Sequence, residues 1–254
     1  PFETVESREN ALLAEYFTAH GNPAEVVSPE QLEYKNGILR KGEFTIDVIY
    51  RRLRTPEFLV RYDLTVHPLV RAYRDGAVCV VNSFRSDIAQ RKALLDLLTD
   101  ETVMGKFPAA EKKAIRTFIP ITRVMGERKA LWGKEEVDLP EFVLHNRERL
   151  VLRPNTDSSE TAEFLGSAMD DTQWERACKR AIRERYVVQE IVAPVTAKFP
   201  VSTYGMLDYK DMRVDIHPHV CLGKVHSCSA WLTPASAGFS TAVGVTPAFI
   251  LESK

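Results

Sequence analysis

Short apolar runs alternate with turn residues over the first part of the chain. Apolar positions at helical spacing begin after Ser7 and end before Gly21, which predicts a capped amphipathic helix with a glycine stop. Short β segments are predicted at residues 24–27 and 44–50, and Asn36-Gly37 predicts a hairpin turn between them. This section therefore has the pattern of a small α/β unit.

The middle of the chain combines a short apolar strand with amphipathic stretches. Residues 77–81 are entirely apolar and lead through Asn82-Ser83 into a helix predicted over residues 86–98. This is the layout expected of a buried parallel strand in an α/β protein. Further helices are predicted at Pro68–Arg74 and Ala109–Phe118.

The last section begins with strands on either side of a polar loop. Strands are predicted at Leu150–Arg153, 163–165 and 186–192, with a helix over residues 170–185. The core-facing stripe of that helix is predicted to be Trp174, Ala177, Cys178, Ala181 and Ile182. β-rich sequence then continues to Ile250.

A polar, interrupted region at residues 106–140 marks the predicted domain boundary. We place it after residue 125, which gives an N-terminal α/β unit over residues 1–125 and a second portion over residues 126–254. The chain opens at Pro1 without an initiator Met and runs almost directly into a helix, so we treat it as a possible fragment.

Composition narrows the classes of partner and compartment. The chain has 254 residues with 34 basic and 35 acidic side chains, so bulk charge implies neither nucleic acid nor an anionic membrane as a partner. Four cysteines and no secretory leader predict a cytoplasmic protein without a disulfide framework. The apolar runs fall far short of the roughly 20 residues that a membrane span needs.

The stretch over residues 150–166 has the layout of a phosphate-binding grip. A strand that ends in the cation Arg153 is followed by a loop and a return strand, and the later strand Tyr186-Val-Val-Gln-Glu190 could offer backbone amides to a purine edge. A strand, loop and return strand can close over the phosphates of ATP. This arrangement is how ATP-grasp proteins hold their nucleotide.

An ordered set of segments resembles the circularly permuted ATP-grasp family, which is related to glutathionylspermidine synthases. The segments are residues 46–52, 81–84 with Lys92 in the next helix, 150–154, 186–190 and 244–251. The resemblance implies an α/β fold of ATP-grasp type and ATP-dependent ligation of a carboxylate to an amine through an acyl-phosphate. It also implies ATP and Mg²⁺ as cofactors, an unknown carboxylate or amine substrate, and a protein partner or upstream segment as a further possibility.

The resemblance also implies roles for individual residues. Lys92 and Arg153 match cations near the nucleotide phosphates, Arg153 standing where the family usually has a second lysine. The residues that match the adenine-facing hinge are Gln189, Glu190 and Ile191. Asn82 matches a residue that lines the nucleotide site, and the catalytic or substrate-orienting residues that the resemblance implies are Arg51, Arg52 and Arg153. The alternatives are a strand-end charge pair for Arg51 and Arg52, and a surface helix lysine for Lys92.

The loop departs from the family pattern. Residues 158–162 read Ser-Ser-Glu-Thr-Ala, and the first glycine is Gly166. Glycine lets backbone amides approach an anion closely, whereas Glu160 brings a negative charge towards a negative ligand. Arg153 can bind phosphate in a bidentate way but does not reproduce the point charge of lysine. The alternative to a ligase is therefore a catalytically inactive ATP-grasp scaffold that acts as a binding module.

A separate cluster of histidine and cysteine residues offers a candidate metal site. If Gly223-Lys224 forms a two-residue turn, Cys221 pairs with His226 and His219 pairs with Cys228, which places four possible zinc ligands on one sheet face. The spacing matches no standard zinc motif, and a one-residue shift in register would scatter the ligands over both faces. The alternative is a set of core residues that line the sheet.

Overall fold

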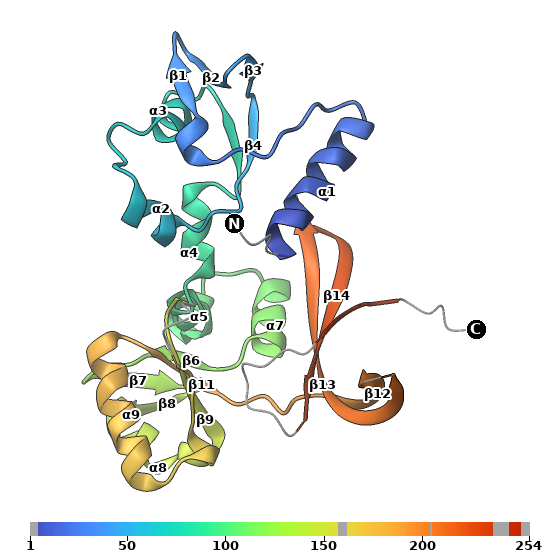
Figure 1. Ribbon diagram of the computed structural model, residues 1–254. Helices are drawn as coiled ribbons and strands as arrows, with labels where there is room; N and C mark the ends of the chain where they lie inside the picture. Colours follow the sequence, from blue (N-terminus) through green and yellow to red (C-terminus); the bar gives the residue numbers. More distant parts are fainter. Residues whose placement is uncertain (1–4, 157–161, 204, 236–243, 250–254) are drawn as a thin grey trace. The chain divides into compact units, whose positions relative to one another are not determined.

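The computed structural model describes residues 5–156, 162–203, 205–235 and 244–249 (Figure 1). It forms two compact units, Pro1–Gln90 and Arg91–Lys254. The sequence predicts a boundary after residue 125, whereas β6 (Thr122–Val124) and the segment before it from Arg91 onwards belong to the second unit. The physical reason is that β6 pairs with a strand of the second unit's sheet, and α5 (Ala93–Thr99) packs on β6. No helix among the described residues is long and apolar enough to cross a membrane.

The first unit mixes helices with short strands. Its helices are α1 (Val5–Ala19), η1 (Pro29–Gln31), α2 (Thr55–Arg61), α3 (Pro68–Arg74), η2 (Phe84–Ser86) and α4 (Asp87–Gln90). Its strands are β1 (Glu33–Lys35), β2 (Ile38–Lys41), β3 (Phe44–Thr45), β4 (Val48–Tyr50) and β5 (Cys79–Val81). Strands β1, β2 and β3 form an antiparallel sheet, and β4 pairs with β5 in parallel. The buried residues of this unit's core are Leu32, Leu39, Ile46, Phe58, Leu69, Val70, Ala72, Val78 and Val80.

Most local predictions for the first unit are confirmed. The predicted first helix is α1, Pro68–Arg74 is α3, and Asn36 and Gly37 both have positive φ, 52° and 77°, in the turn between β1 and β2. The strand predicted at residues 24–27 is wrong, because this run pairs with no strand in the described part of the chain. The β segment at residues 44–50 is two strands, since β3 pairs with β2 and β4 pairs with β5.

The helix predicted over residues 86–98 is also two helices, α4 and α5. The α5 helix starts at Ala93, whose backbone N–H donates to the Asn155 side chain at 2.8 Å. The neighbouring Lys92 N–H donates to the Asn155 carbonyl at 3.1 Å. A helical pattern at residues 86–98 therefore ends at Gln90 and restarts at Ala93, because Asn155 takes the first backbone donors of α5.

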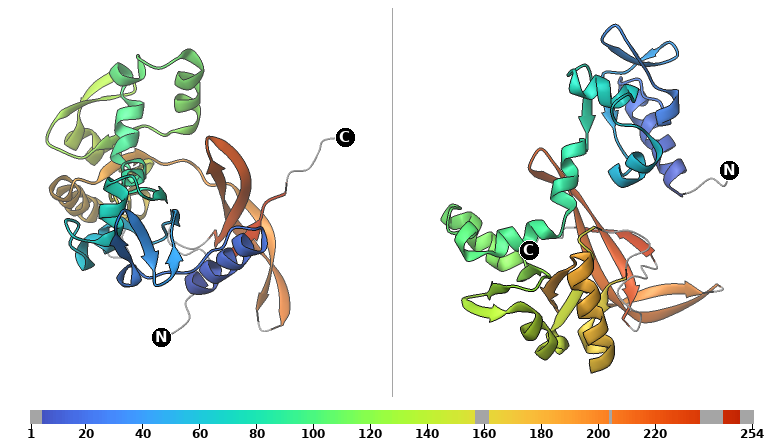
Figure 2. Two further views of the ribbon diagram at one scale, coloured as in Figure 1. Left: turned by 90° about the horizontal axis from the view of Figure 1, so that it is seen from above. Right: turned by 90° about the vertical axis from the view of Figure 1, so that its left-hand side faces the viewer.

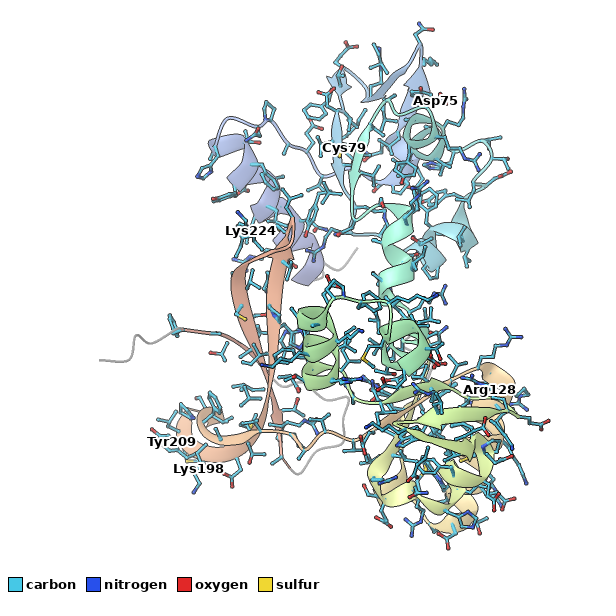
Figure 3. All side chains as sticks on the ribbon, turned by 180° about the vertical axis from the view of Figure 1, so that it is seen from behind. Asp75, Cys79, Arg128, Lys198, Tyr209 and Lys224 are labelled. Atoms are coloured by element: carbon cyan, nitrogen blue, oxygen red, sulfur yellow. The ribbon has the colours of Figure 1, made fainter. Side chains whose placement is uncertain are left out.

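The second unit contains two four-stranded sheets. The first has the strand order β10-β9-β11-β6, all antiparallel, with β9 (Leu150–Arg153), β10 (Phe164–Leu165) and β11 (Val187–Glu190). The second has the order β12-β13-β14-β15, with β12 (Thr196–Thr203), β13 (Met206–Cys221), β14 (Lys224–Pro234) and β15 (Gly244–Pro247). A two-stranded hairpin is formed by β7 (Lys129–Trp132) and β8 (Glu135–Asp138). Figure 3 labels Lys224 at the start of β14 and Lys198 and Tyr209 on β12 and β13.

Helices cover one face of the first sheet. The remaining helices of the unit are α6 (Glu101–Met104), α7 (Ala109–Phe118), α8 (Leu139–His145), η3 (Arg147–Arg149), η4 (Gly166–Ala168) and α9 (Asp171–Glu184). Helix α9 packs on β9 and on α8 (Figures 1 and 2). Its predicted stripe is confirmed: Trp174, Ala177, Cys178 and Ala181 are buried and Ile182 packs against them. Asp170 caps α9 by accepting from the Gln173 N–H at 2.8 Å, the geometry of a capping box.

His67 makes the stability of the first unit depend on pH. Its Nδ1 accepts from the Leu69 N–H at 3.2 Å at the start of α3, and its ring contacts Phe58 and Tyr62. Burial lowers the pKa of His67 below its ordinary value, against the charge of Glu30 that raises it. The folded state therefore favours neutral His67. The stability that neutral His67 contributes to the first unit is fully present above about pH 6.5, the pKa of a histidine in the unfolded chain. This contribution is lost as the pH falls from there towards the lower pKa of His67 in the folded state.

Replacing His67 with asparagine removes this titration and keeps an acceptor for the Leu69 N–H. We expect the melting temperature of the native protein to fall more steeply below about pH 6.5 than that of His67→Asn. Melting temperatures of both proteins across pH 5 to 8 check this. Parallel curves would contradict the assignment of neutral His67 to the folded state.

Candidate functional site

The first sheet of the second unit presents two chemically different faces. Leu150, Leu152 and Val188 are fully buried in the core that contains Trp174 of α9. Since successive side chains of a strand point to opposite faces, the residues between them point away from that core. The other face therefore carries Arg153 on β9 and Gln189 on β11, while β6 places Thr122 directly opposite Gln189.

Arg153 is the cation at the end of β9. Its Nε donates to Glu163 Oε1 at 2.7 Å, and its Nη2 lies 2.7 Å from the same oxygen. Its Nη1 donates to Gln189 Oε1 at 3.4 Å. The side chain is 36% exposed, so it is partly accessible while it bridges the two sides of the loop between β9 and β10. Sequence analysis singled out Arg153 and Gln189, and the structure brings them into contact.

The Gln189 side chain is held by a hydrogen bond to Thr122 on the neighbouring strand. The Gln189 side chain is 5% exposed, and its Nε2 donates to Thr122 Oγ1 at 2.9 Å. The Thr122 hydroxyl in turn donates to the Pro120 carbonyl at 2.9 Å. The predicted hinge residue is thus part of a buried polar network rather than a freely exposed amide.

Lys92 lies beside the chain that leaves β9. The two residues after Arg153 are Pro154 and Asn155, and Asn155 binds the backbone N–H groups of Lys92 and Ala93. The structure therefore brings Lys92, at the start of α5, next to the segment that carries Arg153. The two predicted phosphate-binding cations belong to one locality of the second unit.

The hinge after β11 has a distinct backbone pattern. The Glu190 N–H donates to the Ile121 carbonyl at 3.1 Å, and the Ile191 N–H donates to the Arg149 carbonyl at 2.9 Å. The next residue, Val192, is 67% exposed, and its N–H has no hydrogen-bond partner within the described part of the chain. The Val192 amide therefore differs from those of Glu190 and Ile191, which are both bound to backbone carbonyls.

Arg51 and Arg52, the predicted site arginines of the first unit, have different environments. Arg51 is 8% exposed, and it donates to the carbonyls of Asn82, Leu53 and Ser83 at 2.7, 2.6 and 3.2 Å. Arg51 therefore holds the turn after β5, where Asn82 has a φ of 57°, and its donors are used inside the unit. Arg52 has a different role.

Arg52 forms a two-bond ion pair with Glu9 of α1. Its Nη1 and Nη2 donate to the two carboxylate oxygens at 3.2 and 2.7 Å, and the Arg52 side chain is 36% exposed. The hydrogen bonds to Glu9 raise the pKa of Arg52 above its ordinary value. Arg52 thus already binds a carboxylate in the geometry that suits an acidic ligand.

The predicted metal cluster does not form. The turn between β13 and β14 is Leu222-Gly223, with positive φ of 49° and 76°, so Cys221 pairs with Lys224. A bulge after His219 leaves His226 without a strand partner and pairs Cys228 with Pro218. The predicted pairs of Cys221 with His226 and of His219 with Cys228 are wrong. Among the described residues no group of three or more His, Cys, Asp or Glu could hold a metal ion.

The loop over residues 158–162, which lacks glycine, lies mostly outside the described residues. Its residues 158–161 are not among the described residues, and Ala162 is exposed. The first glycine after it, Gly166, is buried in η4, where an added Cβ would lie 2.0 Å from the Arg147 carbonyl oxygen. Gly166 therefore serves close backbone packing.

Arg123, a buried arginine of the same region, is a residue that the sequence patterns did not indicate. Arg123 on β6 is 1% exposed and donates to the carbonyls of Leu131, Thr122 and Thr99 at 2.6, 2.6 and 3.1 Å. Burial lowers the pKa of Arg123, while Asp96, 3.6 Å away, raises it. Arginine stays protonated under such shifts. The link between α5, β6 and β7 therefore contains a buried positive charge.

Three other residues at the site also escaped sequence analysis: Thr122, Asn155 and Glu163. Asn155 follows a strand and a proline, a context that favours capping, and this signal was available in the sequence. Thr122 is far from Gln189 along the chain, so nothing local indicates their contact.

The family model described as circularly permuted ATP-grasp type 2 matches residues 6–235. No curated protein matches the chain.

A search of solved structures gives two ATP-grasp proteins among its matches. One is a RimK domain protein ATP-grasp from Sphaerobacter thermophilus DSM 20745, with 20% identity and a TM-score of 0.43 over 78% of this chain and 65% of that one. The other is the ATP-grasp ligase PsnB complexed with minimal precursor, with 11% identity and a TM-score of 0.46 over 92% of this chain and 75% of that one. The chain thus spans about two thirds of the length of the first protein.

Proposed function

Because the chain belongs to the circularly permuted ATP-grasp type 2 family, we propose that it binds ATP through the Arg153, Lys92 and β11 hinge region. We further propose that ATP activates a carboxylate for attack by an amine. The observation that carries the proposal is the joint placement of Arg153, Gln189 and Lys92 in one locality, followed by the exposed Val192 amide. Together they supply cations for phosphates and a backbone donor for a purine.

The residues present fit ATP. Arg153 offers a guanidinium that can bind phosphate oxygens with two parallel hydrogen bonds, and Lys92 adds a second positive charge near the same segment. The N–H of Val192 can donate to a ring nitrogen of adenine at the end of β11. No cluster of carboxylates that could form a protein-built metal site occurs among the described residues, and no step is assigned to Mg²⁺.

In the proposed reaction an oxygen of the substrate carboxylate attacks the γ-phosphorus of ATP. The bond from the γ-phosphorus to the bridging oxygen breaks, and ADP leaves. The amine then attacks the acyl carbon, inorganic phosphate leaves, and the amine proton passes to solvent. Arg153 and Lys92 act by neutralising charge on the phosphates during the first step.

Arg52 is the proposed carboxylate-orienting residue of the first unit. The support is its two-bond geometry with Glu9, which is the geometry that a substrate carboxylate would take. We do not propose this role for Arg51, because its donors already bind three backbone carbonyls. The proposed substrate class is a carboxylic acid.

A thermal-shift experiment tests nucleotide binding. Saturating ATP with Mg²⁺ is expected to raise the melting temperature by about 5–10 °C, the effect of about 2.7 kcal/mol at a hundred times the dissociation constant. Arg153→Ala is expected to abolish most of this shift. Arg183→Ala is the matched control. Arg183 is 76% exposed on α9, and its replacement removes the same charge as Arg153→Ala. A native protein that shows no shift at millimolar ATP contradicts the proposal.

A non-catalytic binding module is the second candidate. It is favoured by Arg153 and Glu163, since this ion pair occupies the guanidinium edge that phosphate would use. Release of inorganic phosphate from ATP in the presence of mixed carboxylates and amines separates the candidates. ATP binding without phosphate release supports the module, and release that depends on both substrates supports the ligase.

A further inference from the structure

A directional hydrogen-bond chain runs from a backbone carbonyl to the Arg153 guanidinium. Thr122 donates to the Pro120 carbonyl at 2.9 Å, and Gln189 Nε2 donates to Thr122 at 2.9 Å. Arg153 Nη1 then donates to Gln189 Oε1 at 3.4 Å. Thr122 is 0% exposed and Gln189 is 5% exposed, so water does not compete for the buried links.

The polarity of this chain is fixed at its buried end. The Pro120 carbonyl only accepts, so the Thr122 hydroxyl uses its single hydrogen there and its oxygen must accept from Gln189. Only the amide nitrogen of Gln189 can donate, which turns its carbonyl oxygen towards Arg153. The opposite orientation of the amide would place an N–H₂ donor against a guanidinium, which has no acceptor.

This polarity decides which edge of Arg153 is available. Gln189 holds Nη1, so the edge formed by Nε and Nη2 points at Glu163. That edge carries two parallel donors and is the one that a phosphate would meet on replacing Glu163. Glu163 is the carboxylate that now occupies it, with a side chain 28% exposed.

We propose that Thr122 is a positioning residue that sets the orientation of the Gln189 amide, and through it the phosphate-facing edge of Arg153. This inference rests on the proposed function, because it assigns Arg153 to the phosphates of ATP. Thr122 itself contacts no ligand in this scheme. Its hydroxyl, and not its size, is the feature that matters.

Two variants of Thr122 separate the hydroxyl from packing. Thr122→Val keeps the shape and removes the hydroxyl, so Gln189 Nε2 loses its acceptor and the amide is no longer held at its buried end. Thr122→Ser keeps the hydroxyl. We expect Thr122→Val to weaken the binding of ATP about tenfold and Thr122→Ser to bind ATP within about twofold of the native protein.

Isothermal titration with ATP and with adenosine supplies the readout that a packing defect would not give. Adenosine lacks phosphates, so its affinity is expected to stay unchanged in Thr122→Val. In the Arg153→Ala background, Thr122→Val is expected to add nothing further, because the two residues act in one chain.

The outcomes distinguish this inference from the proposed function. If the native protein binds ATP but Thr122→Val binds it equally well, the role of Thr122 is overturned and the nucleotide site stands. Equal loss of ATP and adenosine binding, or failure of Thr122→Ser to restore ATP binding, also overturns it. If the native protein binds no ATP, the proposed function fails, and the inference that rests on it fails too.

Discussion

Replacing Gly166 with alanine is expected to destabilise the second unit by about 3 kcal/mol, near the upper end for overpacking in a buried site. The new Cβ would lie 2.0 Å from the Arg147 carbonyl oxygen and 2.7 Å from its carbon. These are backbone atoms, so no rotamer change can relieve the overlap. Arg147 is also tied to this segment, because its Nη1 donates to the Gly166 and Met169 carbonyls at 3.1 and 2.7 Å.

Thermal denaturation followed by far-UV circular dichroism measures this effect. A loss of about 3 kcal/mol corresponds to a fall of roughly 6–12 °C in melting temperature for a unit of this size. Gly126→Ala is the matched control, because an added Cβ there meets nothing within 4 Å. Similar melting temperatures for Gly166→Ala and Gly126→Ala would show that the contact with Arg147 is not tight in solution.

Replacing Arg123 with methionine is expected to lower the free energy of unfolding by about 3–5 kcal/mol. This is the range for removing one partner of a buried ion pair. The change removes the guanidinium bonds to the Leu131, Thr122 and Thr99 carbonyls, in a region where Arg123 is 1% exposed. It also removes a positive charge 3.6 Å from Asp96. Arg123→Lys is expected to recover less than half of the loss, because one ammonium cannot reach all of these acceptors.

Arg128 provides the control for this prediction. It also pairs with Asp96, at 2.9 Å, but its side chain is 46% exposed. Arg128→Met is therefore expected to change stability by less than about 1 kcal/mol. Chemical denaturation of the three variants gives the comparison. An Arg123→Met protein as stable as Arg128→Met would mean that the buried bonds of Arg123 contribute little.

Local patterns predicted the elements that carry the site. The family membership and the fold of circularly permuted ATP-grasp type, expected from ordered segments, are confirmed by the family match. Strand β9 and helix α9 lie where the pattern placed them, because an apolar run and a capped amphipathic stripe are local signals. The apolar run at residues 24–27 shows the limit of such signals, since a strand also needs a neighbour to pair with.

Turn registers and long-range polar contacts were harder to predict. The hairpin turn was assigned to Gly223-Lys224, but Leu222 adopts a φ of 49°, a conformation that favours glycine or asparagine. This shift by one residue and the bulge after His219 together break the predicted His and Cys pairs. The contact between Thr122 and Gln189 depends on strand order in the sheet, which no short segment of the sequence encodes.

We propose that ATP binds at the β11 hinge and the start of α5. Hydrogen–deuterium exchange with and without ATP tests it most directly, because the Val192 N–H has no partner in the described chain and the adenine would give it one. We expect slower exchange with ATP in peptides that contain Val192 and Lys92, no change in β13 and β14, and loss of the effect in Arg153→Ala. Unchanged exchange at Val192 and Lys92 at saturating ATP would contradict it.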